Sequence, residues 1–127
     1  MIVVDATTVV NGLLRSGASR RRLQRHELHT PHLADSEVVS TLTRLVRAGR
    51  IERAAAERAV TGWAALGVRR YPVHGLLSRM WALRENVKAY DATYVALAEI
   101  LELPLVTGDQ RLARAPGVRC EVVVVGD

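Results

Sequence analysis

The spacing of hydrophobic residues changes several times along the chain, and each change predicts a different element. The opening run Ile2-Val3-Val4 is β-branched and ends at an acid, which is typical of a short buried strand that leads into a helix. Comparable apolar runs predict strands at 68–71, 104–107 and 120–125. Helical spacing predicts helices at 8–14, after Ser19, from Thr30-Pro31 to 49, and at 51–66, 76–83, 89–102 and 109–113.

This alternation of short strands and helices predicts an α/β fold. Parallel strands require crossover connections, and the predicted helices supply them. We therefore expect a three-layer α/β/α arrangement around a central, mainly parallel sheet of about four to five short strands. The 127 residues fit a single domain spanning 1–127. In such sheets, functional sites lie outside the carboxyl ends of the strands.

Composition excludes several classes of protein. Hydrophobic residues make up 49% and charged residues 24% of the chain, which is ordinary globular composition. Cys120 is the only cysteine, so an internal disulfide is excluded, and we expect an inert core thiol in a Val-rich strand. No apolar run approaches the length of a membrane span, and the first residues lack the basic start of a secretory signal. We expect a cytoplasmic protein with no membrane contact.

The charge balance suggests a polyanionic partner. The formal net charge is +5, from 18 Lys and Arg against 13 Asp and Glu, and every cation except Lys88 is arginine. The guanidinium fork suits phosphate because it donates two hydrogen bonds at once. The basic cluster of Arg20, Arg21, Arg22 and Arg25 supplies candidate contacts to such a partner, and a solvated helix face is an equally good interpretation of it.

Three aspartates stand where a parallel sheet would bring them together. Asp5 closes the first strand and Asp109 follows the strand at 104–107, so both belong to the same sheet edge. Asp91 shares a helix face with Tyr94 and Val95, and a carboxylate on an apolar face is costly unless it is paired or binds a metal. Taken singly, each of these acids could instead cap a helix or meet its dipole.

Converging carboxylates repel one another, and a hard divalent ion resolves that repulsion. Ligand sets made only of oxygen select Mg²⁺ or Mn²⁺, and Mg²⁺ often binds substrate phosphate as well. An acidic site on a basic protein therefore predicts a metal-dependent nuclease. In the middle helix, periodicity places Glu37 on a solvated face and leaves the position of Asp35 undecided.

Four segments resemble PIN-domain ribonucleases, above all the VapC-type toxins of bacterial toxin–antitoxin pairs. They run in the family's order and reach from one end of the chain to the other: Val3-Val4-Asp5-Ala6-Thr7, Ser36-Glu37-Val38, Tyr90-Asp91-Ala92-Thr93-Tyr94-Val95-Ala96-Leu97-Ala98 and Val106-Thr107-Gly108-Asp109-Gln110-Arg111-Leu112. The third and fourth segments are the specific ones, because an aspartate after two valines is common.

The resemblance implies an acidic catalytic and metal-binding site. Its members would be Asp5, Glu37, Asp91 and Asp109, which overrides the solvated placement of Glu37. Thr107 would support the site by hydrogen bonding, Thr7 occupies a position where the family often has Ser or Thr, and Arg111 is a further candidate RNA contact. The expected cofactor is Mg²⁺, with Mn²⁺ also accepted, and the expected reaction is endoribonuclease cleavage of RNA.

The resemblance also implies a cognate antitoxin and a homodimer. The stripe of Ala56, Ala59, Val60 and Trp63 could face either partner, or could be plain core. Two alternatives stay open: a housekeeping RNA-processing nuclease without an antitoxin, and an inactive binding module.

Histidine chemistry offers a rival mechanism. A metal-independent ribonuclease would use pairs of histidines as acid and base. The spacing marks no such pair, and we expect surface or loop positions for His26, His29, His32 and His74.

Overall fold

A single sheet of five parallel strands forms the centre of the molecule, which is described for residues 1–126 by a computed structural model. The strands are β1 (Ile2–Val4), β2 (Leu28–Pro31), β3 (Val68–Tyr71), β4 (Leu105–Thr107) and β5 (Val122–Val124). Their order in the sheet is β3-β2-β1-β4-β5, and every neighbouring pair is parallel. All carboxyl ends therefore point to the same edge, as the sequence predicts.

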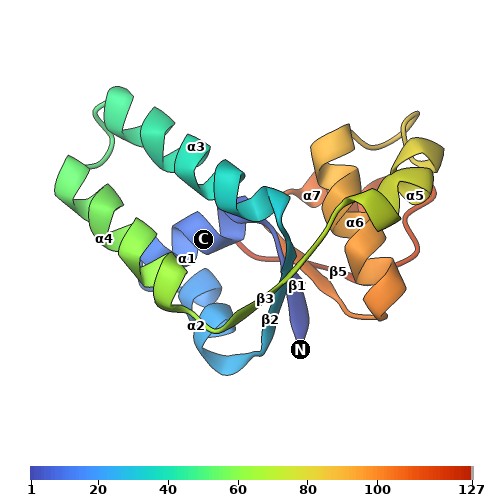
Figure 1. The fold of residues 1–127 in the computed structure, drawn as a ribbon, viewed down its shortest axis with the longest axis horizontal. Coiled ribbons are helices and arrows are strands. Elements are labelled where there is room, and N and C mark those ends of the chain that lie inside the picture. Colours follow the sequence, from blue (N-terminus) through green and yellow to red (C-terminus); the bar gives the residue numbers. More distant parts are fainter. Residues whose placement is uncertain (127) are drawn as a thin grey trace.

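Helices cover both faces of this sheet. They are α1 (Ala6–Leu14), α2 (Ala18–Arg25), α3 (Leu33–Arg47), α4 (Arg53–Ala65), α5 (Leu77–Ala82), α6 (Ala89–Leu101) and α7 (Gln110–Arg114), with a 3₁₀ turn η1 (His74–Leu76) before α5. Figure 1 shows α1 to α4 on one side of the strands and α5 and α6 on the other. The expected three layers are confirmed. None of the helices among residues 1–126 has the length and apolar character needed to cross a bilayer.

The strand β2 corrects one prediction, since Thr30-Pro31 ends a strand instead of starting a helix. The Thr30 hydroxyl donates to the Val4 carbonyl oxygen at 3.0 Å, and the whole strand is buried between β1 and β3. Pro31 is the last strand residue, and the next amide, of His32, continues the pairing by donating to Tyr71 O at 2.8 Å. A proline without an amide hydrogen is tolerated at such an end.

His29 is a second correction, because it lies in β2 and is only 5% exposed. Its Nδ1 is 2.6 Å from the Tyr71 hydroxyl. The prediction of a surface or loop histidine is therefore wrong at this position. The prediction failed because β2 was not recognised as a strand. Helices cover both faces of the sheet, so side chains on either face of β2 are buried.

The helix α6 is the central helix of its layer, with an unbroken buried run over residues 92–98. Small side chains such as Ala92, Ala96 and Ala98 let its backbone approach the sheet closely, and it contacts β1, β2 and β4. The first turn of α6 lies near the carboxyl ends of the strands, and its last turn lies near the opposite edge.

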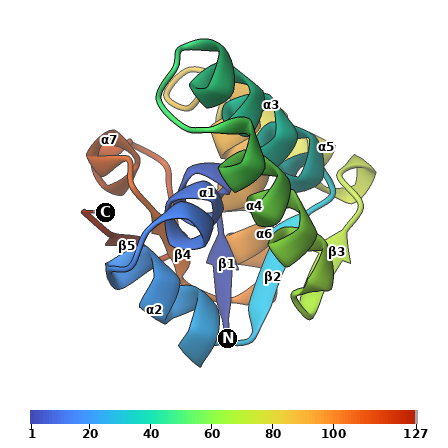
Figure 2. The same cartoon turned by 90° about the vertical axis from the view of Figure 1, so that its left-hand side faces the viewer.

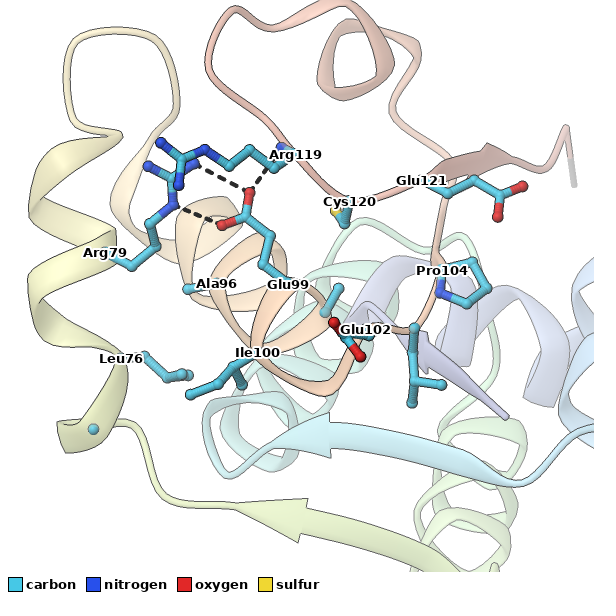
Figure 3. Close-up of a pocket in the computed structure, with 13 residues that line it drawn as sticks. Leu76, Arg79, Ala96, Glu99, Ile100, Glu102, Pro104, Arg119, Cys120 and Glu121 are labelled. Carbon is cyan, nitrogen blue, oxygen red and sulfur yellow. Dashed lines mark hydrogen bonds and ion pairs between the residues drawn. The ribbon is translucent and has the colours of Figure 1, made fainter.

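An ion pair holds that last turn (Figure 3). The carboxylate of Glu99 accepts hydrogen bonds from Arg79 Nε at 2.6 Å, Arg79 Nη2 at 3.2 Å and the Arg119 amide at 2.8 Å. Burial raises the pKa of Glu99, but the bonds from Arg79 and Arg119 outweigh that effect and leave the pKa below its usual value. The cluster ties α6 to α5 and to the segment before β5.

A cavity of about 610 Å³ lies beside this cluster. Burial raises the pKa of the Cys120 thiol on its wall to about 11, so the thiol is protonated at neutral pH. This supports the expectation of an unreactive cysteine, although Cys120 precedes β5 and does not form part of it. None of the four candidate acids lines this cavity.

We expect Glu99→Gln to lower the free energy of unfolding at pH 7 by about 2 kcal/mol, because the Arg79 charge loses its buried partner. The folded-state pKa of Glu99 lies below its usual value near 4.5, so the contribution is present above that value and disappears as pH falls through the folded-state pKa. Urea unfolding at pH 7 and pH 3 measures this difference. Glu121→Gln, on an exposed residue of the same cavity wall, is the matched control and should change stability little at either pH.

Candidate active site

Three of the four predicted acids line one pocket of about 410 Å³ at the carboxyl edge of the sheet. Asp5 directly follows β1, Asp109 follows β4, and Asp91 lies in the first turn of α6. Thr7 and Asn11 from α1 complete the polar lining. The parallel topology therefore brings together residues that are about a hundred positions apart in the chain.

Asp5 is the most deeply held of these carboxylates. Its Oδ1 accepts the Thr8 amide at 2.9 Å, which caps α1, and its Oδ2 accepts the Thr107 hydroxyl at 2.5 Å. Burial raises the pKa of Asp5, the hydrogen bonds from Thr107 and Thr8 oppose the rise, and the nearby Asp109 charge adds to it. The helix-cap interpretation therefore holds for Asp5, and the same carboxylate also lines the pocket.

Asp91 is half-buried, and its carboxylate accepts no hydrogen bond from any residue between 1 and 126. Burial is the main cause that raises its pKa, followed by the charges of Asp109 and Asp5, while Lys88 and Arg111 act in the opposite direction. Asp91 is therefore an electron-pair donor with no competing protein partner.

Glu37, in α3, does not line this pocket, but it lies close enough to Asp5 and Asp91 for their charges to affect its carboxylate. The Tyr94 hydroxyl donates to Glu37 Oε1 at 2.5 Å, and Tyr94 itself is only 2% exposed. Burial raises the pKa of Glu37, the Tyr94 bond lowers it, and the charges of Asp91 and Asp5 raise it further. The solvated placement from periodicity is wrong, because a helical wheel drawn on Val38 and its stripe ignores the partner that α6 provides.

Asp109 differs from the other three, because an arginine holds it. Its carboxylate accepts the Arg111 amide at 2.9 Å, Arg111 Nε at 3.2 Å and Arg111 Nη2 at 3.3 Å, and it caps α7. These bonds are the main reason that the pKa of Asp109 is below its usual value. The Thr107 hydroxyl that serves Asp5 also accepts the Asp109 amide at 3.1 Å.

Comparison with known proteins is consistent with this arrangement. Residues 2–118 match the PIN domain family. The chain belongs to the PIN-domain family. It is 47% identical over 125 residues to a VapC ribonuclease of Mycobacterium bovis, with 98% of each chain covered. A crystal structure from Pyrobaculum aerophilum has a TM-score of 0.68 at 26% identity, covering 95% of this chain and 81% of that one. A toxin–antitoxin complex from Klebsiella pneumoniae has a TM-score of 0.66 at 18% identity, covering 98% and 97%, which shows a shared fold.

Nucleases of the PIN-domain family depend on a metal ion, and the donor chemistry of this site fits one. Within residues 1–126, no three His, Cys, Asp or Glu side chains are already grouped to hold an ion. Asp5 and Asp91 nevertheless line one pocket, with pKa values raised by burial and by neighbouring negative charges. A hard divalent cation relieves that repulsion and prefers such oxygen ligands.

The arginines that the sequence suggests as RNA contacts separate into two regions of this PIN domain. Arg20 is engaged, with Nε and Nη2 donating to Gly12 O at 2.9 Å and Leu13 O at 3.2 Å. Figure 2 shows α2 beside the N-terminus, at the end of β1 opposite to Asp5. A separate hollow of about 280 Å³ is lined by Arg21, Arg22 and Arg25 together with His26. Only Arg111 adjoins the acids, and RNA binding by any of the five stays a prediction.

Asp35 lies outside the acidic site. Its carboxylate accepts Trp63 Nε1 at 2.7 Å and Arg70 Nε at 2.9 Å, and the Arg70 guanidinium carbon lies 5.1 Å from the centroid of the Trp63 ring. The side chain therefore fastens α3 to α4 and β3.

Sequence reasoning missed Tyr94 as a functional candidate and assigned it to the core. The missed signal is its hydroxyl, which lies one turn after Asp91 on the same helix face and needs a partner once it is buried. The charge of Glu37 and the burial of the ring together raise the pKa of Tyr94, with burial the larger cause, so the phenol stays protonated and donates.

We expect Asp5→Asn to raise the melting temperature of the metal-free protein at pH 7 by roughly 3–5 °C. The change removes a buried negative charge, and asparagine still caps α1. Mn²⁺ should raise the melting temperature of the wild-type protein and leave that of the variant nearly unchanged. Asp109→Asn is the matched control and should not stabilise, because its charge is already paired with Arg111.

We expect Tyr94→Phe to weaken Mn²⁺ binding by about tenfold, because the Glu37 carboxylate loses the donor that orients it. Calorimetric titration with Mn²⁺ measures the effect. Tyr71→Phe deletes another hydroxyl, the one bonded to His29, and should lower stability without changing Mn²⁺ affinity. Equal Mn²⁺ affinities of the two variants would contradict this role of Tyr94.

Proposed function

We propose that this chain is a Mg²⁺-dependent endoribonuclease and the toxin of a toxin–antitoxin pair. The single observation that carries the proposal is that three carboxylates, two that follow β1 and β4 and one in the first turn of α6, share one pocket in a PIN domain. The similarity to VapC ribonucleases over nearly the full chain supports RNA as the substrate.

Each proposed catalytic residue has a role that follows from its contacts. Asp5 and Asp91 would hold the divalent ion, since no cationic side chain of residues 1–126 forms a direct ion pair with either. Thr107 orients Asp5 through its hydroxyl, and Tyr94 orients Glu37. A bound Mg²⁺ supplies Lewis-acid stabilisation of charge at the phosphodiester and activates water for attack.

Asp109 and Arg111 form the more exposed side of the proposed site. The ion pair is exposed on the arginine, whose side chain is 83% accessible, so RNA phosphate can compete for the guanidinium. Release of Arg111 to phosphate would leave the Asp109 carboxylate available to the ion or to water. Thr7 lines the same pocket and can donate a hydrogen bond to substrate or water.

The proposed partners are an antitoxin and a second copy of the chain. In the stripe that could face one of them or belong to the core, Ala59 and Trp63 are buried in the core. Ala56 and Val60 instead line an apolar groove of about 480 Å³ between α3 and α4, together with Val39. Partner contact is thus proposed only for Val60, which is exposed, and for Ala56, which is partly buried.

We expect cleavage of single-stranded RNA in Mg²⁺, complete loss of cleavage with EDTA, and 5′-phosphate and 3′-hydroxyl ends on the products. Asp91→Asn should lower kcat by roughly a hundredfold or more, because it removes a charged ligand. End-group analysis of labelled RNA provides the measurement. Cyclic phosphate ends with resistance to EDTA would favour the histidine mechanism, and no cleavage at all would favour an inactive binding module.

A further inference from the structure

A second hollow, of about 420 Å³, adjoins the acidic site on the far side of Glu37. Its wall is built from one face of α3 and the start of α6, and the residues used below are Ser36, Glu37, Ser40, Thr41, Arg44 and Tyr90. Glu37 belongs to this hollow, and its carboxylate feels the charges of Asp5 and Asp91. Glu37 therefore links this hollow to the neighbourhood of the acids.

Tyr90 presents an aromatic ring at its edge. The side chain is 66% exposed, immediately before Asp91 in the sequence, and its hydroxyl has no partner among residues 1–126. The other strongly exposed aromatic residue, Trp81, already stacks with the Arg84 guanidinium, which lies 4.2 Å from its ring centroid. Tyr90 is thus an uncovered aromatic surface next to a proposed metal ligand.

Arg44 supplies a cation in the same hollow. Its guanidinium donates to the Thr41 hydroxyl at 3.2 Å, and no carboxylate of residues 1–126 pairs with it. Glu37 lines the same hollow, but its Oε1 is taken by Tyr94. The charge of Arg44 is therefore available to an anion from outside, and guanidinium groups match phosphate in shape and charge.

We propose that this hollow binds one nucleotide of the RNA next to the cleaved bond, with the base stacked on Tyr90 and a neighbouring phosphate on Arg44. This inference rests on the proposed ribonuclease function. Single-stranded RNA is commonly held by an aromatic ring that stacks a base and by arginine at the backbone. The hydroxyls of Ser36, Ser40 and Thr41 add hydrogen-bonding groups for a base edge or a sugar. A volume of several hundred cubic ångströms is typical of small-ligand sites.

The experiment compares Tyr90→Leu, Tyr90→Phe and wild type on short single-stranded RNAs. One set carries normal bases, and a second set carries a single abasic residue at each position around the cleavage site. We expect Tyr90→Leu to raise KM by about tenfold with little change in kcat, and Tyr90→Phe to behave like wild type, because phenylalanine keeps the stacking face. Removal of the base that occupies the hollow should cost wild type a similar factor and should cost Tyr90→Leu almost nothing further.

Arg44→Gln tests the phosphate contact. It should weaken RNA binding measured in EDTA by fluorescence anisotropy, and the weakening should shrink as salt is raised. Arg47→Gln, one turn along α3 on the wall of the other groove, is the matched control and should bind like wild type.

Two results would overturn the nucleotide site: an unchanged KM in Tyr90→Leu, or equal losses on abasic RNA in both proteins. Mn²⁺ titration and the cleavage of normal RNA by the wild-type protein check the proposed function separately. A wild-type protein that cleaves RNA while Tyr90 and Arg44 prove silent refutes only this site. If the wild-type protein neither cleaves RNA nor binds Mn²⁺, the proposed function fails, and the anisotropy experiment still decides whether the hollow binds RNA.

Discussion

Negative charge gathered at the carboxyl edge of the sheet is the constraint on which the rest of the structure depends. Asp5, Asp91 and Asp109 share one pocket, and Glu37 feels two of their charges. Burial and mutual repulsion raise the free energy of the ionised carboxylates. The surrounding structure must therefore hold them at this edge against that cost. Short hydrogen bonds from Thr107 and Tyr94, the amide of Thr8 and the ion pair with Arg111 provide that restraint.

The helix α6 connects this edge to the opposite one. Its first turn carries Asp91, its middle carries Tyr94, and its last turn carries Glu99, which binds Arg79. The buried run between them packs on three strands. Core packing and the ion pair at the far end of α6 therefore fix the position of Asp91 at the acidic site. The acids themselves contribute only mutual repulsion.

Elements whose apolar residues follow one clear period could be predicted from the sequence. The strands that contain Val3 and Val106 are short buried runs, the strand that contains Val123 is a run of three valines at the edge of the sheet, and α6 has a complete apolar face. Parallel pairing then requires Asp5 and Asp109 to meet at one edge. The strand β2 was not predicted, because His29 and Pro31 interrupt the apolar pattern that is typical of a strand. Only the pairing with both neighbouring strands shows that this segment is one.

The residues of the candidate site also divide into those that the sequence could place and those that only the tertiary structure could place. The sequence by itself determined that Asp5, Asp91 and Asp109 belong to a common region, since strand ends and helix periodicity are local properties that repeat along the chain. Only the tertiary structure decided that Glu37 is turned inward onto Tyr94, that Arg111 holds Asp109, and that Asp35 serves Trp63 and Arg70 instead of the acids. The physical reason is that each of these choices depends on a hydrogen-bond donor brought into reach by packing, and no pattern within a single helix contains information about that donor.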